Sequence, residues 1–195
     1  IGMDNVEAGY TVGKMVAEKI GGEGNVIILQ GMAGASTSIE RTEGYEKAMA
    51  EYPGITVVAS QNADFQQDKA QTVMADLLQA NEDIKAVICC NDLMALGAIV
   101  SLEEAGYTVG GDDGVVVGSY DISVPCLEAI KEGKIYVTGY HWGKLYGYWG
   151  VQMALDAING LEVPGHIVSP HSEITIDNVD NFLPFCEELA AYNFN

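Results

Sequence analysis

Short apolar runs alternate along the chain with segments in which apolar residues recur at helical spacing. The runs cover residues 25–29, 55–60, 85–90, 114–120 and 134–140, and they are rich in β-branched residues, which is typical of strands. The helical patterns cover residues 36–52, 66–80, 91–105, 122–132 and 142–159. Strands that alternate with helices predict a parallel sheet with right-handed crossovers. Because the strands are almost continuously apolar, we expect helices on both faces, in an α/β fold with a Rossmann-like, doubly wound parallel sheet.

The beginning of the chain does not look like the start of a self-contained domain. Residues 1–20 open at what resembles the end of a strand and continue into a helix that no strand precedes. A protein with two lobes would need roughly another 100 residues, which is about one more domain. We therefore expect the chain to be the carboxyl-terminal part of a longer protein.

Composition and charge narrow the classes of function. Hydrophobic residues make up 48% of the chain and charged residues 19%, which is typical of a globular protein. The formal net charge is −19, and a field of that sign repels phosphate backbones, so we expect no binding of nucleic acid. No apolar run reaches the length that spans a membrane.

The motifs of common enzymes and cofactor sites are missing. The stretch GMAGASTS at 31–38 follows a strand, but it lacks the lysine of a P-loop and is not G-x-G-x-x-G. The sequence has no G-x-S-x-G elbow, no spacing of His, Cys and Asp that suits zinc, and no EF-hand loop. We therefore expect no catalysis, no cofactor and no metal.

The four cysteines form no C-x-x-C pair. Cys89 and Cys90 are adjacent on a predicted strand, so they point to opposite faces and cannot hold one metal together. We interpret the cysteines as small buried apolar residues, and a disulfide between Cys126 and Cys186 remains the alternative.

Polar and aromatic side chains collect where the predicted strands end. In open parallel sheets, ligands bind outside the carboxyl ends of the strands. The residues that follow the five strands are Met32, Gly34, Thr37 and Arg41; Asp64 and Phe65; Asn91 and Asp92; Tyr120 and Asp121; and Tyr140, His141 and Trp142. Carboxylate, amide and guanidinium groups pair with adjacent hydroxyls, and aromatic rings cover apolar ring faces. The pattern predicts a site for a small polyhydroxylated molecule.

Several of these residues have a structural role as an alternative. Asp92 stands where it can cap the following helix, which would leave Asn91 to contact a ligand. Thr37 and Glu40 have the spacing of a capping box, and Asp121 could cap the next helix. A solvated position on a helix or loop is the alternative for two residues, Arg41 and His141.

At these residues the chain resembles the periplasmic sugar-binding proteins of the ribose/galactose type, which are the solute receptors of ABC importers. The resemblance lies in DNVEAG (4–9), GMAGASTSIERTEGY (31–45), ASQNADFQQDKA (59–70), CNDLMALGAI (90–99), VVGSYDIS (116–123) and GYHWGKLYG (139–147). It extends over most of residues 1–168, and it is strongest to the ribose-binding branch. The family has two Rossmann-like lobes (periplasmic binding protein-like I) joined by three crossing segments, with the sugar between them.

The resemblance implies roles for particular side chains. Four would donate hydrogen bonds to sugar hydroxyls or accept them: Arg41, Asn91, Asp121 and His141. Phe65 would stack on the sugar ring, and the pocket would also be lined by Tyr120, Met32 and Thr37. Met3 falls near the first hinge crossing, where members of the family contact ligand. His141 departs from the Gln or Asn that is usual at its position, so neither the sugar nor the pH dependence of binding carries over.

The resemblance also implies a division of the chain. Residues 1–22 and 142–166 would be remnants of the amino-terminal lobe, residues 23–141 the carboxyl-terminal lobe, and residues 167–195 a return to that lobe with a tail helix. Remnant helices without their sheet would expose apolar faces, so we expect self-association.

The function implied is binding of a pentose or hexose in the cleft between the lobes, followed by docking on a membrane permease. Such a receptor is extracytoplasmic, either in the periplasm or lipid-anchored on the cell surface. Two alternatives share the fold: the effector-binding core of a LacI-type transcription regulator and the ectodomain of a sugar sensor. The strong acidity of the chain favours an extracellular receptor over the regulator.

Overall fold

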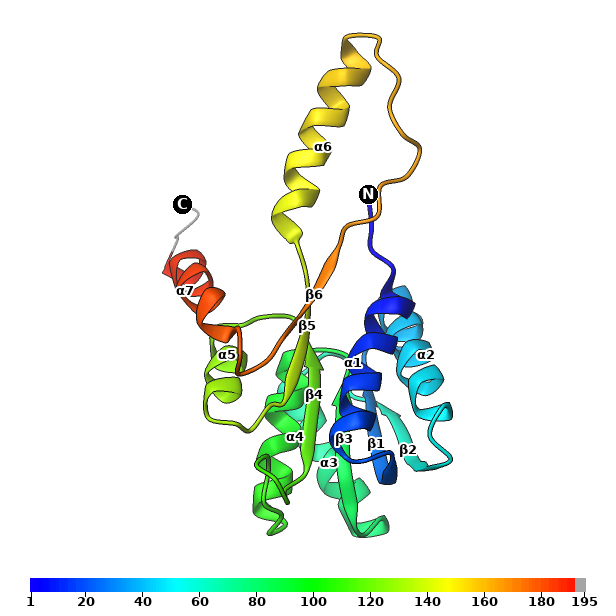
Figure 1. Ribbon diagram of the computed structural model, residues 1–195, viewed down its shortest axis with the longest axis vertical. Helices are drawn as coiled ribbons and strands as arrows, with labels where there is room; N and C mark the ends of the chain where they lie inside the picture. The colour runs from blue at the N-terminus through cyan, green and yellow to red at the C-terminus, as the bar shows by residue number, and fades with distance from the viewer. Residues whose placement is uncertain (192–195) are drawn as a thin grey trace.

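The computed structural model describes residues 1–191, which form a six-stranded sheet with helices on both faces (Figure 1). The strand order is β2-β1-β3-β4-β5-β6, in which β1 to β5 are parallel and β6 is antiparallel to β5. The strands are β1 (Glu23–Gln30), β2 (Gly54–Asn62), β3 (Ile84–Cys89), β4 (Val116–Tyr120), β5 (Val137–His141) and β6 (His171–Ile174). The helices are α1 (Asn5–Lys19), α2 (Ser36–Ala50), α3 (Gln67–Ala80), α4 (Asp92–Glu104), α5 (Val124–Lys131), α6 (Gly143–Ile158), the 3-10 turn η1 (Val179–Asn181) and α7 (Leu183–Ala191). The predicted α/β fold is confirmed.

The predicted strands and helices between residues 23 and 159 are all present, and only their ends are shifted. Strand β5 begins at Val137, later than the apolar pattern predicts. The carbonyl oxygen of Ala129 accepts hydrogen bonds from the backbone nitrogens of Lys134, at 2.9 Å, and Ile135, at 3.2 Å. These two residues are therefore held in the turn that ends α5, although Ile135 is an apolar residue that the pattern assigned to the strand.

The order in which successive strands are added to the sheet reverses at β1. The chain passes from β1 outward to β2, returns to β3 on the other side of β1, and then continues to β4 and β5. Right-handed crossovers then put α1 and α2 on one face and α3, α4 and α5 on the other. The gap between the carboxyl ends of β1 and β3 is a topological switch point, which is where sheets of this kind bind ligands.

Helix α1 packs against the sheet and α2, which corrects the expectation that residues 1–22 lack a sheet. Val12 and Val16 of α1 are fully buried in the main core. A Cβ atom at Gly9 would stand 2.4 Å from the carbonyl oxygen of Arg41, so only glycine lets α1 and α2 approach this closely. The first turn of α1 therefore lies beside Arg41.

Helix α6 and the returning segment 159–168 project from the body as an arm (Figure 1). No residue of α6 is buried. The arm returns beside the start of the chain, because the backbone nitrogen of Gly2 donates to the carbonyl oxygen of Ile167 at 3.0 Å and Ser169 donates to Gly2 at 2.7 Å. The assignment of residues 142–166 to the amino-terminal lobe stays a prediction.

The tail adds the antiparallel strand β6 and then η1 and α7, as the expected return to the main body requires. The last four residues of the expected tail segment, 192–195, lie outside the described residues. The thiols of Cys89, Cys90, Cys126 and Cys186 are all free and buried, so the structure does not contain the alternative Cys126–Cys186 disulfide. Among residues 1–191, no helix combines the length and the apolar character needed to cross a bilayer.

Candidate functional site

Arg41 lies at the switch point and is almost fully buried, with 5% of its surface exposed. Its Nη1 donates to the carbonyl oxygen of Cys90 at 2.7 Å, directly after β3. Its Nε donates to Oδ1 of Asn5 at 3.2 Å, and its guanidinium carbon lies 3.7 Å from the ring centroid of Tyr120. Arg41 therefore joins the start of α1, the residue after β3 and the last residue of β4, and the alternative that it lies in solvent is wrong.

The cap of α4 is Asn91 and not the expected Asp92. Helix α4 is capped by Asn91, whose Oδ1 accepts from the backbone nitrogen of Met94 at 3.0 Å. Asp92 is the first helical residue, and its Oδ2 accepts from the backbone nitrogen of Ser123 at 2.7 Å. The expectation that Asp92 caps this helix is therefore wrong, and contact of Asn91 with a ligand stays a prediction. The Nδ2 of Asn91 donates to the carbonyl oxygen of Phe65 at 3.2 Å, so this amide joins the loops after β2 and β3.

Asp121 follows β4 and is held by its backbone. Its nitrogen donates to the carbonyl oxygen of Gly139 at 2.8 Å, and its own carbonyl oxygen accepts from Oγ1 of Thr138 at 2.7 Å. Helix α5 is capped by Ser123, so Asp121 is not the cap. Burial raises the pKa of the Asp121 carboxyl from 3.8 to about 6, against the opposing effect of the Arg41 charge, and the nearby Asp92 adds to the rise.

His141 ends β5 inside a group of aromatic rings. Its ring centroid lies 6.4 Å from that of Tyr120 in a stacked arrangement, 6.0 Å from Tyr140 and 5.5 Å from Tyr146. Burial, and then the charge of Arg41, lower the pKa of His141, so the neutral imidazole is favoured. Its Nδ1 is buried without a hydrogen-bond partner among the described residues.

Two further rings complete the edge. Phe65 has a φ of +60°, which is unusual for a bulky residue, and a Cβ atom at Gly31 would stand 2.0 Å from its ring. The ring of Phe65 therefore lies directly over the end of β1. The hydroxyl of Tyr120, which is fully buried, lies 3.7 Å from Sδ of Met3. Side-chain contacts thus link Met3, Arg41 and His141 to Tyr120. With Phe65, Asn91 and Asp121 they form the cluster of predicted binding residues at this edge of the sheet.

Comparison with known proteins identifies the family. Residues 1–162 match the periplasmic binding protein domain. The chain belongs to this family.

Relatives of the domain support this assignment. The chain is 40% identical over 163 residues to the ribose import binding protein of Salmonella typhimurium, which covers 84% of this chain and 53% of the relative. It is 35% identical over 181 residues to the xylitol-binding protein of Mycolicibacterium smegmatis, covering 91% and 50%. A solved periplasmic solute-binding protein of Actinobacillus succinogenes with bound D-allose is 35% identical with a TM-score of 0.86, covering 93% of this chain and 62% of the other. The chain spans about half the length of these two curated relatives.

Two predicted site residues of this periplasmic binding protein domain, Met32 and Thr37, lie outside the cluster. Met32 is 52% exposed on the loop after β1. Thr37 is half-buried in the first turn of α2, where the cap position is Ala35 and no side chain accepts a capping hydrogen bond. Glu40 accepts instead from Nδ2 of Asn5 at 3.0 Å, so the predicted capping box is wrong.

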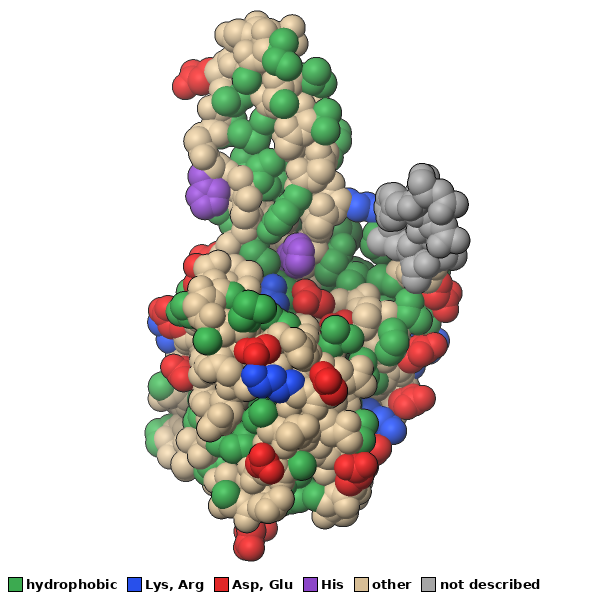
Figure 2. Space-filling view, turned by 180° about the vertical axis from the view of Figure 1, so that it is seen from behind, with side chains coloured by type: hydrophobic (Ala, Val, Ile, Leu, Met, Phe, Trp, Pro, Cys, Tyr) green, Lys and Arg blue, Asp and Glu red, His purple; other side chains and the backbone are tan. Residues whose placement is uncertain are grey.

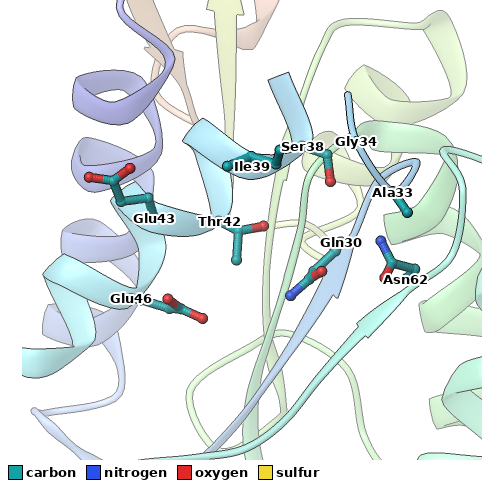
Figure 3. Close-up of a pocket in the computed structure, with 9 residues that line it drawn as sticks. All are labelled: Gln30, Ala33, Gly34, Ser38, Ile39, Thr42, Glu43, Glu46 and Asn62. Atoms are coloured by element: carbon teal, nitrogen blue, oxygen red, sulfur yellow. The ribbon is translucent and has the colours of Figure 1, made fainter. Parts of the chain in front are cut away.

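The hollow in Figure 3 lies beside the cluster and shares no residue with it. It has a volume of about 420 Å³ and lies between α2 and the ends of β1 and β2, lined in part by Gln30, Thr42, Glu46 and Asn62. No residue of the cluster is fully exposed: Arg41, Asn91 and Tyr120 are buried, and Met3, Phe65, Asp121 and His141 are half-buried. Among residues 1–191, no cluster of His, Cys, Asp and Glu could hold a metal ion.

Sequence analysis missed Asn5, which is 7% exposed and contacts both Arg41 and Glu40. A signal was present in DNVEAG, because Asp4 caps α1 by accepting from the backbone nitrogen of Glu7 and so leaves the next residue without a need to be polar. For the pair Asn91 and Asp92, the expected cap was Asp92, so the polar character of Asn91 was assigned to a ligand. Asn91 is itself the cap, and its polar character has that explanation.

Proposed function

We propose that this periplasmic binding protein domain forms one wall of a sugar-binding cleft in the extracytoplasmic solute-binding component of an ABC sugar importer. The observation that carries the proposal is the contact of Tyr120 with both Arg41 and His141, near the Asp121 carboxyl, at the carboxyl edge of the parallel strands. Hydrogen-bond donors, hydrogen-bond acceptors and aromatic rings therefore lie close together at this edge.

The chemistry of these groups matches vicinal hydroxyls. Arg41 has five N–H donors and the described residues take two of them, so three remain for a ligand. The Asp121 carboxylate accepts from hydroxyls, which are themselves donors and acceptors, so adjacent hydroxyls can bridge the two side chains. Phe65, on the adjacent loop, presents a ring to the apolar face of a sugar.

The named relatives support this class of ligand. They are a ribose import binding protein, a xylitol-binding protein and a solute-binding protein with bound D-allose. All three ligands are small molecules with several adjacent hydroxyls. These relatives favour a transport receptor over the effector-binding core of a regulator, and they favour binding without catalysis.

The arrangement of the chain supports hinge closure. We propose that the β1–β6 body with α1 is one lobe, and that α6 with residues 159–166 packs on a second lobe. The three segments near residues 2, 142 and 168 would then be the crossings, and two of them pair directly through Gly2 and Ser169. Sugar hydroxyls that bridge the lobes would favour the closed state, which would dock on a membrane permease.

Titration of the chain with ribose, allose, xylitol, myo-inositol and galactose tests the proposal, by calorimetry and by chemical-shift changes in NMR spectra for weak binding. We expect one of these polyols to bind, and Arg41→Ala and Asp121→Ala each to abolish the binding. Lys69→Ala is the control, because Lys69 pairs with Asp64 at an exposed position outside the cluster. Failure of all five ligands, or equal binding by the two site variants, would contradict the proposal.

We propose also that the arm mediates self-association of this chain. Figure 2 shows hydrophobic side chains along the arm. The exposed apolar residues there include Tyr148 (65%), Val151 (64%), Leu155 (49%) and Ile158 (80%). An apolar face of this kind associates with another surface in water, and for the chain alone that surface is a second copy.

A further inference from the structure

The orientation of the Arg41 guanidinium decides whether its free donors face a ligand. Two hydrogen bonds and one ring contact fix the group: Cys90 accepts at 2.7 Å, Asn5 accepts at 3.2 Å, and Tyr120 lies against its face at 3.7 Å. The Cys90 bond is to a backbone carbonyl and the ring contact has no direction within the plane. Asn5 is therefore the one side chain among the described residues that holds the Nε edge of Arg41 by a hydrogen bond.

Asn5 lies between a cation and an anion. Its Oδ1 accepts from Arg41 and its Nδ2 donates to Oε2 of Glu40 at 3.0 Å. A turned amide would place its NH₂ group against the guanidinium and its oxygen against the carboxylate, and both contacts would repel. The Glu40 carboxylate therefore fixes the amide so that its oxygen faces Arg41.

The position of Asn5 is set by packing that is independent of these hydrogen bonds. Asp4 caps α1, so Asn5 occupies the first helical position and is 7% exposed. The close approach of Gly9 to the backbone of Arg41 holds the next turn of α1 against α2. Met3, two residues earlier, touches the hydroxyl of Tyr120 at 3.7 Å. The segment that follows the first crossing thus touches both Arg41 and the ring against which Arg41 lies.

We infer that Asn5 is a positioning residue, which holds the Nε edge of Arg41 so that the remaining N–H groups face the ligand. The inference rests on the proposed function for its consequence in sugar binding. The geometry that it asserts can be measured without any ligand, because Arg41 is the only arginine of the 195-residue sequence. Its Nε–H group gives a single side-chain resonance that needs no assignment by elimination.

The experiment is hydrogen exchange of this Nε–H group by ¹⁵N NMR, at one fixed pH, in the whole chain. Asn5→Ala removes the acceptor without adding bulk, and we expect exchange to become about 10-fold faster or more. Asn5→Asp combined with Glu40→Gln restores an acceptor oxygen without setting two carboxylates against each other, and it should restore slow exchange. Asn25→Ala is the matched control, because the Asn25 amide also makes one 3.0 Å hydrogen bond, to Glu82, at the other end of the sheet. The backbone spectrum of each variant reports whether it is folded.

Three results would overturn the inference: unchanged exchange in Asn5→Ala, equally fast exchange in the Asn5→Asp, Glu40→Gln variant, or an equal effect of Asn25→Ala. The sugar arm of the test uses whichever of ribose, allose, xylitol, myo-inositol and galactose binds. Asn5→Ala should weaken that binding about 10-fold, and it should have no further effect in an Arg41→Lys background. An additive effect in that background would contradict action through Arg41. If no sugar binds, the proposed function fails, while the exchange result still decides the positioning role.

Discussion

Replacing Asp121 with asparagine should stabilise the chain at neutral pH. Burial raises the pKa of this carboxyl to about 6, so the folded structure favours the neutral form at a site that carries a charge at pH 8. The amide has nearly the same shape and no charge. Asn also tolerates the φ of +80° at this position, because Asn and Asp are both enriched in the left-handed region.

The magnitude follows from the difference in proton binding between the folded and unfolded states. The pKa in the unfolded chain is about 3.9, so the shift of about two units corresponds to about 3 kcal/mol of unfolding free energy. Below about pH 4 the carboxyl is protonated in both states, and the cost is absent. The cost grows as the pH rises from 4 to 6, and above pH 6 it is complete, because the carboxyl is then ionised in both states.

Urea unfolding of the wild-type chain and Asp121→Asn at pH 4, 6 and 8, followed by fluorescence, measures this difference. We expect similar unfolding free energies at pH 4 and a more stable variant at pH 8, by up to about 3 kcal/mol. Asp112→Asn, at an exposed loop position, is the control and should show no comparable change with pH. A variant that is less stable at pH 8, or a difference that stays constant from pH 4 to 8, would refute the reasoning. Because a carboxylate accepts hydroxyl hydrogens and an amide NH₂ does not, the same variant should bind the sugar less tightly.

Three further predictions follow from the contacts. Asn91→Ala should lower the unfolding free energy by about 1 kcal/mol through loss of the cap of α4, whereas Asn91→Asp should retain the cap; equal losses in urea unfolding would contradict this. Ile158→Glu, on a side chain that is 80% exposed, should reduce self-association without loss of stability, and an unchanged sedimentation profile would count against the arm as the interface. All four thiols should react with a thiol reagent only after unfolding, because they are buried and burial raises the pKa of each, that of Cys126 to about 12; rapid reaction of the native chain would disprove this.

The fold could be predicted from the sequence because the pattern of apolar residues and the turn residues agree. The centres of β1 and β3 are uninterrupted apolar runs, residues 26–29 and 86–89, and each strand is followed by a helix with apolar residues at helical spacing. The antiparallel strand β6 could not be predicted in this way. It is four residues long, mostly half-buried, and contains His171 and Glu173, so it has no continuous apolar run.

The site could be predicted only as a set of residues at one edge. The topology of a parallel sheet brings the residues after each strand together, and this was enough to find Arg41, Asp121 and His141. It was not enough to assign Asn91 and Asp92, because capping depends on which of two adjacent residues leaves the helical conformation. Asn91 does, with φ and ψ of −152° and 171°, so Asn91 and not Asp92 is the cap. Asn5 was missed because its partners Glu40 and Arg41 are 35 and 36 residues away in the sequence.

Departures from local rules collect at the edge where the predicted binding residues lie. Phe65 adopts a positive φ that disfavours its side chain, Asp121 does so with a buried carboxyl, and Nδ1 of His141 is buried without a partner among the described residues. Asp83 also has a positive φ, at the opposite edge of the sheet, but it is an exposed turn residue of a type that tolerates this conformation. A chain selected for stability alone would replace a desolvated carboxyl, or an imidazole whose Nδ1 has no partner among the described residues, with an apolar side chain. The presence of the Asp121 carboxyl and the His141 imidazole at one edge of the sheet is therefore better explained by a ligand that forms hydrogen bonds with them.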